Sequence, residues 1–127
     1  MKQDGDVLVV DDEPDLAESM VRLLRASGYP TRSAGNGVEA LEAVAEHMPS
    51  VVLLDILMPI MDGWECARQL RARYGNNLPI VVITAAEHIQ QRCREIDADE
   101  VLAKPFDLRQ LLEVVRRHGP APEPTRH

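Results

Sequence analysis

The sequence predicts a doubly wound α/β domain in which helices cover both faces of a five-stranded parallel sheet. Short, unbroken apolar runs at residues 7–10, 51–54 and 80–83 are typical of strands that are buried on both faces. Amphipathic helical patterns alternate with these runs, and such alternation favours parallel strands joined by right-handed crossovers. We expect the strand order 2-1-3-4-5, which places a binding crevice between the first and third strands.

The size and composition of the chain fit a single globular domain. Its 127 residues can bury a core without a metal or a disulfide, and with 3% aromatic residues that core must be aliphatic. The formal net charge of -7 argues against direct binding to nucleic acid, which requires a basic surface. No apolar run approaches the roughly 18 residues of a membrane span. We therefore expect a cytoplasmic protein that contacts neither nucleic acid nor membrane.

The two cysteines are predicted to be structural. Cys66 and Cys93 form neither a CxxC motif nor a metal-ligand pattern, and both lie among helix-forming residues. We expect reduced, semi-buried thiols.

The first half of the chain contains three predicted strands and two helices. After the strand at residues 7–10, Pro14 suits the first turn of a helix, and Gly28 suits the left-handed position that ends it. Residues 29–34 form a weaker strand of mixed polarity, as an edge strand can be. Apolar residues recur at helical spacing over residues 38–48, which predicts a second amphipathic helix, and the third strand follows at residues 51–55.

The second half repeats this alternation. Asp62 is predicted to cap a helix that runs to about Tyr74, and residues 80–84 form the fourth strand. Residues 87–97 are expected to form a short, weakly anchored helix, and residues 101–103 the fifth strand. Asp107 can cap the last helix, with Gln110 at the third helical position. We assign the domain to residues 1–118 and regard the proline-rich residues 119–127 as a tail or linker.

The polar residues at the strand ends predict a metal-assisted phosphoacceptor site. They are Asp11 and Asp12 after the first strand, Asp55 after the third, Thr84 after the fourth and Lys104 after the fifth. Converging carboxylates repel each other, and Mg²⁺ is a hard cation that neutralises them while needing few protein ligands. Because a carboxylate is already ionised at neutral pH, Asp55 is a plausible nucleophile that forms an aspartyl phosphate.

These residues together resemble the receiver domain of bacterial two-component response regulators, which has a flavodoxin-like fold. The resemblance runs in register from about Val7 to Arg117. The motifs that carry it are Val9-Val10-Asp11-Asp12-Glu13-Pro14, Leu54-Asp55-Ile56-Leu57-Met58-Pro59, Asp62-Gly63, Thr84-Ala85 and Lys104-Pro105-Phe106. Any one of these motifs is a weak signal, but all of them in order are highly specific.

The resemblance implies a role for each acidic residue at the site. Asp55 would accept a phosphoryl group from a phosphohistidine of a sensor histidine kinase or a histidine phosphotransfer protein. Asp12, Asp55 and the backbone carbonyl of Leu57 would ligate Mg²⁺, and Asp11 would act largely through water. The domain would catalyse only its own phosphorylation and dephosphorylation, so it would not be an enzyme in the ordinary sense.

The resemblance also implies a switch, from which the sequence departs at two positions. Lys104 would pair with Asp55 and then with the phosphoryl group, Thr84 would turn to hydrogen-bond that group, and the peptide before Pro105 would be cis. The family often has Tyr or Phe where this chain has Val101, which puts the aromatic half of the switch in doubt. Asp97 stands where glycine is common.

Output is expected through the surface formed by residues 87–117, which would control a downstream domain or protein. The sequence leaves open whether the chain is a stand-alone regulator or a domain cut from a longer protein at its linker. Homodimerisation is also left open.

Three other functions fit parts of the pattern. A haloacid-dehalogenase-type phosphohydrolase also uses an Asp nucleophile with Mg²⁺, but in a D-x-D motif that residues 11–13 do not match. A flavin-binding module would need amides and hydroxyls around a phosphate where this chain has acids. A receiver-like interaction domain that is never phosphorylated usually lacks part of the acid, threonine and lysine set, which is complete here.

Overall fold

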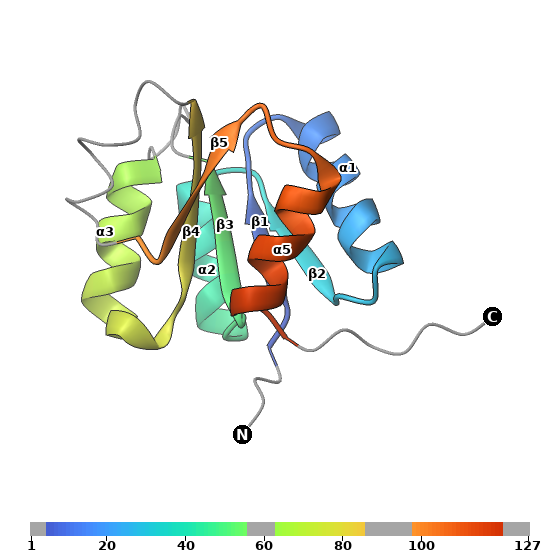
Figure 1. Ribbon diagram of the computed structural model, residues 1–127. Helices are drawn as coiled ribbons and strands as arrows, with labels where there is room; N and C mark the ends of the chain where they lie inside the picture. The colour runs from blue at the N-terminus through green and yellow to red at the C-terminus, as the bar shows by residue number, and fades with distance from the viewer. Residues whose placement is uncertain (1–4, 56–62, 86–97, 121–127) are drawn as a thin grey trace.

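The computed structural model describes residues 5–55, 63–85 and 98–120 and confirms the predicted sheet. Five parallel strands lie in the order β2-β1-β3-β4-β5, and Figure 1 shows all their arrows pointing the same way. The strands are β1 (Val7–Val10), β2 (Thr31–Ala34), β3 (Val51–Asp55), β4 (Ile80–Ala85) and β5 (Glu100–Lys104).

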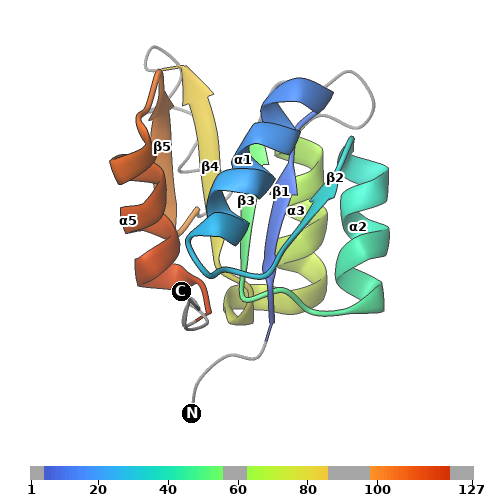
Figure 2. The same cartoon turned by 90° about the vertical axis from the view of Figure 1, so that its right-hand side faces the viewer.

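Helices cover both faces of this sheet. Helices α1 and α5 lie on one face, and α2 and α3 lie on the other (Figures 1 and 2). Their bounds are α1 (Pro14–Ala26), α2 (Gly37–Glu46), α3 (Gly63–Tyr74) and α5 (Leu108–His118), and a short 3-10 helix, η1 (Gly75–Asn77), follows α3. The helix expected at residues 87–97 and the predicted cap Asp62 lie outside the described residues. Within the described part of the chain, no helix is long and apolar enough to span a membrane.

The core consists of two aliphatic layers, one on each side of the sheet. Neighbouring residues of a strand point to opposite faces, so each central strand contributes to both layers. Leu54 packs with Leu70 under α2 and α3, whereas Leu53 packs with Leu111 under α1 and α5, and all four side chains are fully or almost fully buried. Burial on both faces explains why these strands show no polar alternation in the sequence.

Local sequence signals placed several element ends correctly. Gly28 has φ 95°, the left-handed conformation predicted for the residue that ends α1. Asp107 and Gln110 form the expected capping box at the start of α5, with both hydrogen bonds 2.9 Å long. The predicted strand at residues 29–34 was too long, because β2 begins at Thr31 while the Tyr29 N–H donates to the Leu24 carbonyl and so belongs to the end of α1.

Cys66 is a free thiol, as predicted, but the expected semi-buried position was wrong, because the residue is fully buried. Burial raises the pKa of the Cys66 thiol to about 12, so at neutral pH the side chain is a small, protonated, apolar group in the core. Cys93 lies outside the described residues.

Gly5 occupies a position where the chain leading into β1 passes close to the loop between α2 and β3. A Cβ atom at Gly5 would lie 2.5 Å from the Met48 carbonyl oxygen and 2.6 Å from the Ser50 nitrogen. The approach is fixed by hydrogen bonds, since the Ser50 Oγ donates to the Gly5 carbonyl at 2.8 Å and the Ser50 N–H donates to the Asp6 carbonyl at 2.7 Å. Only glycine fits without moving backbone.

Replacing Gly5 with alanine is expected to lower the free energy of unfolding by about 1–3 kcal/mol, because the new methyl group must displace hydrogen-bonded backbone. Chemical denaturation with a circular dichroism readout measures this loss. Gly35→Ala is the matched control, since its Cβ would meet only the Glu39 side chain at 3.4 Å, and its expected change is within about 0.5 kcal/mol. Equal stability of the two variants would contradict the close approach at Gly5.

Candidate functional site

The register of the sheet brings the predicted site residues to one edge. Val10 of β1 is paired with Leu54 of β3, so Asp11 and Asp55 are the next residues of two neighbouring strands. On the other side of β3, Asp55 is paired with Ile83, which places Thr84 one residue further along β4. Because parallel strands end at the same edge, side chains from separate parts of the chain meet there.

Three carboxylates converge at this edge. Oxygen atoms of Asp11, Asp12 and Asp55 all lie within 4.8 Å of one another. Asp11 and Asp55 are buried, with exposed fractions of 3% and 5%, and Asp12 is more exposed than either. Carboxylate oxygens at such separations suit a hard cation such as Mg²⁺, which keeps several water ligands and needs few groups from the protein.

Asp11 is held in place by local backbone. The Glu13 N–H donates to the Asp11 Oδ1 at 2.9 Å, which leaves the other carboxylate oxygen available to the site. Burial raises the pKa of the Asp11 carboxyl above its usual range, and the negative charges of Asp55 and Asp12 raise it further. The Glu13 hydrogen bond and the positive charge of Lys104 lower the pKa of Asp11, but they do not cancel the increase. The site therefore concentrates negative charge that a bound cation would relieve.

Lys104 supplies positive charge beside Asp55. Its Nζ lies 3.6 Å from the Asp55 Oδ2, and its side chain is 32% exposed. The residue ends β5, where it is paired with Ala85 of β4. The peptide bond between Lys104 and Pro105 is cis, as predicted.

Thr84 contributes a buried hydroxyl group to the same edge. The residue is 3% exposed, and its Oγ1 has no hydrogen-bond partner among the described residues. A buried hydroxyl without a partner costs free energy, so its presence here favours a role with a group that arrives at the site.

Asp11, Asp12, Asp55, Thr84 and Lys104 therefore all lie where the sequence pattern places them, at the ends of β1, β3, β4 and β5. The predicted carbonyl ligand, Leu57, lies outside the described residues. Sequence reasoning missed the Glu13 N–H that orients Asp11. An aspartate three residues before a helix-starting proline could have indicated this turn, because Asp side chains often accept hydrogen bonds from backbone two residues on.

Comparison with known proteins identifies the family. A family model described as the response regulator receiver domain matches residues 7–116. Response regulator MprA from Mycobacterium sp. (strain KMS) is 45% identical over 112 residues, which cover 87% of this chain and 48% of MprA. The chain thus spans about half the length of the curated relatives it matches.

Solved structures agree with this assignment. The receiver domain of NtrX from Brucella abortus has a TM-score of 0.82 at 30% identity, covering 89% of this chain and 97% of that one. Response regulator TrrA from Thermotoga maritima, solved in complex with Mg²⁺-BeF, has a TM-score of 0.79 at 35% identity, covering 87% of this chain and 96% of that one. The chain belongs to the response regulator receiver domain family.

Proposed function

We propose that this domain is the phosphoacceptor of a two-component system, in which Asp55 takes a phosphoryl group from a phosphohistidine of a sensor histidine kinase or a histidine phosphotransfer protein. The observation that carries this proposal is the convergence of the Asp11, Asp12 and Asp55 oxygens within 4.8 Å, with the Lys104 Nζ 3.6 Å from Asp55. Such a site can gather a cation and a phosphoryl group around one carboxylate nucleophile.

The transfer itself requires little from the protein beyond position and charge. An Asp55 carboxylate oxygen attacks phosphorus, a P–O bond forms, and the P–N bond of the donor phosphohistidine breaks. The donor imidazole keeps the electron pair of that bond. A carboxylate nucleophile needs no general base to remove a proton from it, and catalysis consists of positioning and stabilisation of the phosphoryl charge.

Mg²⁺ is the proposed metal, with Asp12 and Asp55 as direct ligands. Asp11 would contribute through water, held by the Glu13 N–H, and the carbonyl of Leu57, outside the described residues, is the proposed third protein ligand. The bound ion would supply positive charge that offsets both the carboxylates and the phosphoryl oxygens.

Lys104 and Thr84 are the residues that we propose change partners when Asp55 is phosphorylated. Lys104 pairs with Asp55 at rest and moves its charge to the phosphoryl oxygens after transfer. The Thr84 hydroxyl, which has no hydrogen-bond partner in the described part of the chain, then donates to a phosphoryl oxygen.

Output is proposed to pass through the face formed by residues 87–117. Its described part ties β5 to α5, since the Arg117 Nε donates to the Glu100 Oε1 at 3.1 Å and the His118 Nε2 lies 2.8 Å from the same oxygen. The hydrogen bond from Arg117 holds the pKa of the Glu100 carboxyl below its usual range. Val101 is only partly buried on this edge strand, where it is paired with Val82.

Incubation of the purified chain with phosphoramidate and Mg²⁺ tests the proposed function. Intact-mass spectrometry is expected to detect one added phosphoryl group that is lost in acid, as an acyl phosphate is. Removal of Mg²⁺ with EDTA should prevent the addition. Failure of a well-folded chain to gain any phosphoryl group under these conditions would argue against the proposal.

The unsatisfied Thr84 hydroxyl leads to a prediction about stability. Thr84→Val replaces a hydroxyl that has no partner among the described residues with a methyl group of similar size, so the unphosphorylated chain is expected to gain roughly 1 kcal/mol in free energy of unfolding. Thr31→Val is the matched control, because the equally buried Thr31 hydroxyl donates to the Tyr29 carbonyl at 2.8 Å and its loss should destabilise by about 1 kcal/mol. Denaturant titrations of both variants measure these changes. A destabilised Thr84→Val variant would mean that the resting hydroxyl is satisfied.

A further inference from the structure

The connection that follows Lys104 is very short. Lys104 is the last residue of β5 and Asp107 caps α5, so only Pro105 and Phe106 lie between the site lysine and the helix. Pro105 is exposed, whereas Phe106 is partly buried and packs against the core layer under α1 and α5. Phe106 is therefore the side chain through which this connection is anchored to the core.

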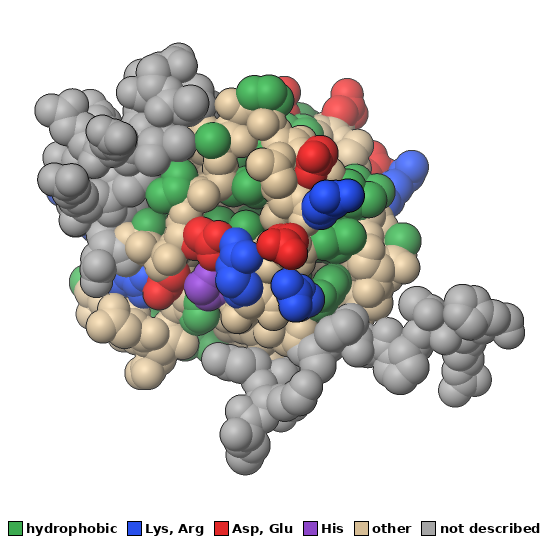
Figure 3. Space-filling model, in the orientation of Figure 1, with side chains coloured by type: hydrophobic (Ala, Val, Ile, Leu, Met, Phe, Trp, Pro, Cys, Tyr) green, Lys and Arg blue, Asp and Glu red, His purple; other side chains and the backbone are tan. Residues whose placement is uncertain are grey.

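Other contacts hold β5 and α5 in place independently of Phe106. At the far end of β5, the Glu100 Oε1 accepts a hydrogen bond from the Arg117 Nε at 3.1 Å and lies 2.8 Å from the His118 Nε2. Figure 3 shows charged side chains gathered over these two elements. β5 is also paired with β4 along its whole length, and the capping box of Asp107 fixes the first turn of α5. Shortening the Phe106 side chain should therefore leave both elements folded.

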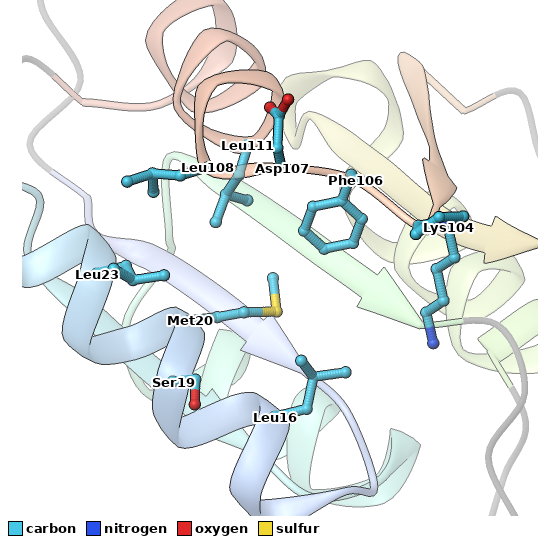
Figure 4. A pocket seen from close by; sticks show the side chains of 10 residues that line it. Leu16, Ser19, Met20, Leu23, Lys104, Phe106, Asp107, Leu108 and Leu111 are labelled. Atoms are coloured by element: carbon cyan, nitrogen blue, oxygen red, sulfur yellow. The ribbon is translucent and has the colours of Figure 1, made fainter.

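Figure 4 shows where the Phe106 ring lies. The ring is directed toward Met20 of α1, with Leu111 of α5 beside it, and these two partners are 3% and 1% exposed. All three side chains line a groove of about 580 Å³ between α1 and α5, and Lys104 borders the same groove. The Lys104 side chain extends away from the ring, toward the end of β3 (Figure 4). The connection is thus anchored in the core by the ring while the lysine reaches into the site.

The position of the Lys104 ammonium depends on where the Lys104 backbone is held. Its Nζ lies 3.6 Å from the Asp55 Oδ2, which is longer than a charge-assisted hydrogen bond of about 2.7–2.9 Å. The side chain is 32% exposed, and a lysine side chain is flexible and strongly hydrated. So long a contact does not fix the ammonium by itself. The backbone must therefore place it, and that backbone is held by β4 on one side and by the connection to α5 on the other.

We propose that Phe106 is a positioning residue for phosphoryl transfer, which anchors the connection between β5 and α5 and so keeps the Lys104 ammonium beside Asp55. The inference rests on the proposed role of Asp55 as the phosphoacceptor. Phe106 acts through Lys104 and takes no part in the making or breaking of bonds. Only the placement of the site's ammonium group depends on the ring.

Loss of the ring is expected to have opposite effects on two measurable properties. When Lys104 spends less time beside Asp55, the phosphoryl charge that develops during transfer is less well stabilised, and the reaction slows. The carboxylates then hold Mg²⁺ more tightly, because the positive charge of Lys104 repels the cation less. A general loosening of the sheet edge would instead lower both the rate and the Mg²⁺ affinity, since the ligand oxygens would also be displaced.

Phe106→Ala tests the proposal with both measurements. At saturating Mg²⁺, phosphoryl incorporation from phosphoramidate is expected to slow about tenfold, as intact-mass spectrometry at matched times measures. Isothermal titration calorimetry without phosphodonor should show Mg²⁺ binding that is about twofold tighter. Phe106→Leu keeps an apolar side chain in the groove and should show both changes at a smaller size. Circular dichroism checks the fold, and Phe106→Leu carries the test if Phe106→Ala does not fold.

Leu112→Ala is the matched control for lost packing. Leu112 is also partly buried against the same core layer, but it lies within α5, away from the connection. This variant should change neither the rate of phosphoryl incorporation nor the Mg²⁺ affinity. If Phe106→Ala behaves as Leu112→Ala does, or lowers both quantities, the ring has no positioning role.

Removal of the lysine charge shows whether the effect of Phe106 passes through Lys104. Lys104→Met alone should raise the Mg²⁺ affinity, and the addition of Phe106→Ala should raise it no further. A further gain in that background would contradict the inference. Normal labelling of both the unchanged chain and Phe106→Ala would overturn this inference alone, whereas an unchanged chain that gains no phosphoryl group would overturn the proposed function and this inference with it.

Discussion

Replacing Asp55 with asparagine is expected to lower phosphoryl incorporation from phosphoramidate by at least about a hundredfold, because the variant lacks the group that forms the new P–O bond. The amide oxygen of asparagine carries no charge and is a poor nucleophile, although its shape is almost that of aspartate. Intact-mass spectrometry at matched times measures the effect.

Two features keep this experiment interpretable. The substitution removes one of three converging negative charges, so repulsion at the sheet edge falls and the variant should remain folded. Asp15→Asn is the matched control, because it makes the same chemical change at an exposed position on α1. Unchanged labelling of a folded Asp55→Asn variant would place the phosphoacceptor elsewhere.

Replacing Asp12 with asparagine is expected to weaken Mg²⁺ binding at least about tenfold, or about 1.4 kcal/mol, since a direct ligand loses its charge. Isothermal titration calorimetry in the absence of phosphodonor measures this affinity separately from phosphoryl transfer. Asp15→Asn should bind Mg²⁺ as the unchanged chain does. If Asp12→Asn retains full affinity, the cation is held by other groups.

Asp11→Asn offers a graded comparison. Its oxygen lies in the same cluster, but the Glu13 N–H already occupies part of its carboxylate, and we propose that it reaches the metal through water. Its effect on Mg²⁺ affinity should therefore be smaller than that of Asp12→Asn.

Much of the site could be predicted because it depends on strand ends. A buried parallel strand is recognisable as an apolar run, and its first polar residue must emerge at the same edge as those of its neighbours. Asp55 and Lys104 are 49 positions apart in the sequence, yet the position of each at the sheet edge could be predicted from its own strand alone. The capping box at Asp107 was equally local.

Contacts between distant segments could not be predicted in this way. Arg32 pairs with Asp6 and donates to the carbonyls of Ala43 and His47 at 3.0 and 2.7 Å, so one side chain ties β2 to the end of α2. Its partners lie 26, 11 and 15 positions away, and no sequence pattern specifies them. The groove between α1 and α5 and the close approach at Gly5 depend in the same way on how complete elements pack.

The central claim is that Asp55 carries the phosphoryl group, and peptide mapping of the phosphorylated wild-type chain tests it most directly. After reaction with phosphoramidate and Mg²⁺, borohydride converts an acyl phosphate to an alcohol, which marks the modified residue in a form that survives digestion. Tandem mass spectrometry is expected to find this mark at Asp55 and at no other carboxylate. A mark at Asp11 or Asp12, or a stable phosphoryl group on a hydroxyl residue, would contradict the account.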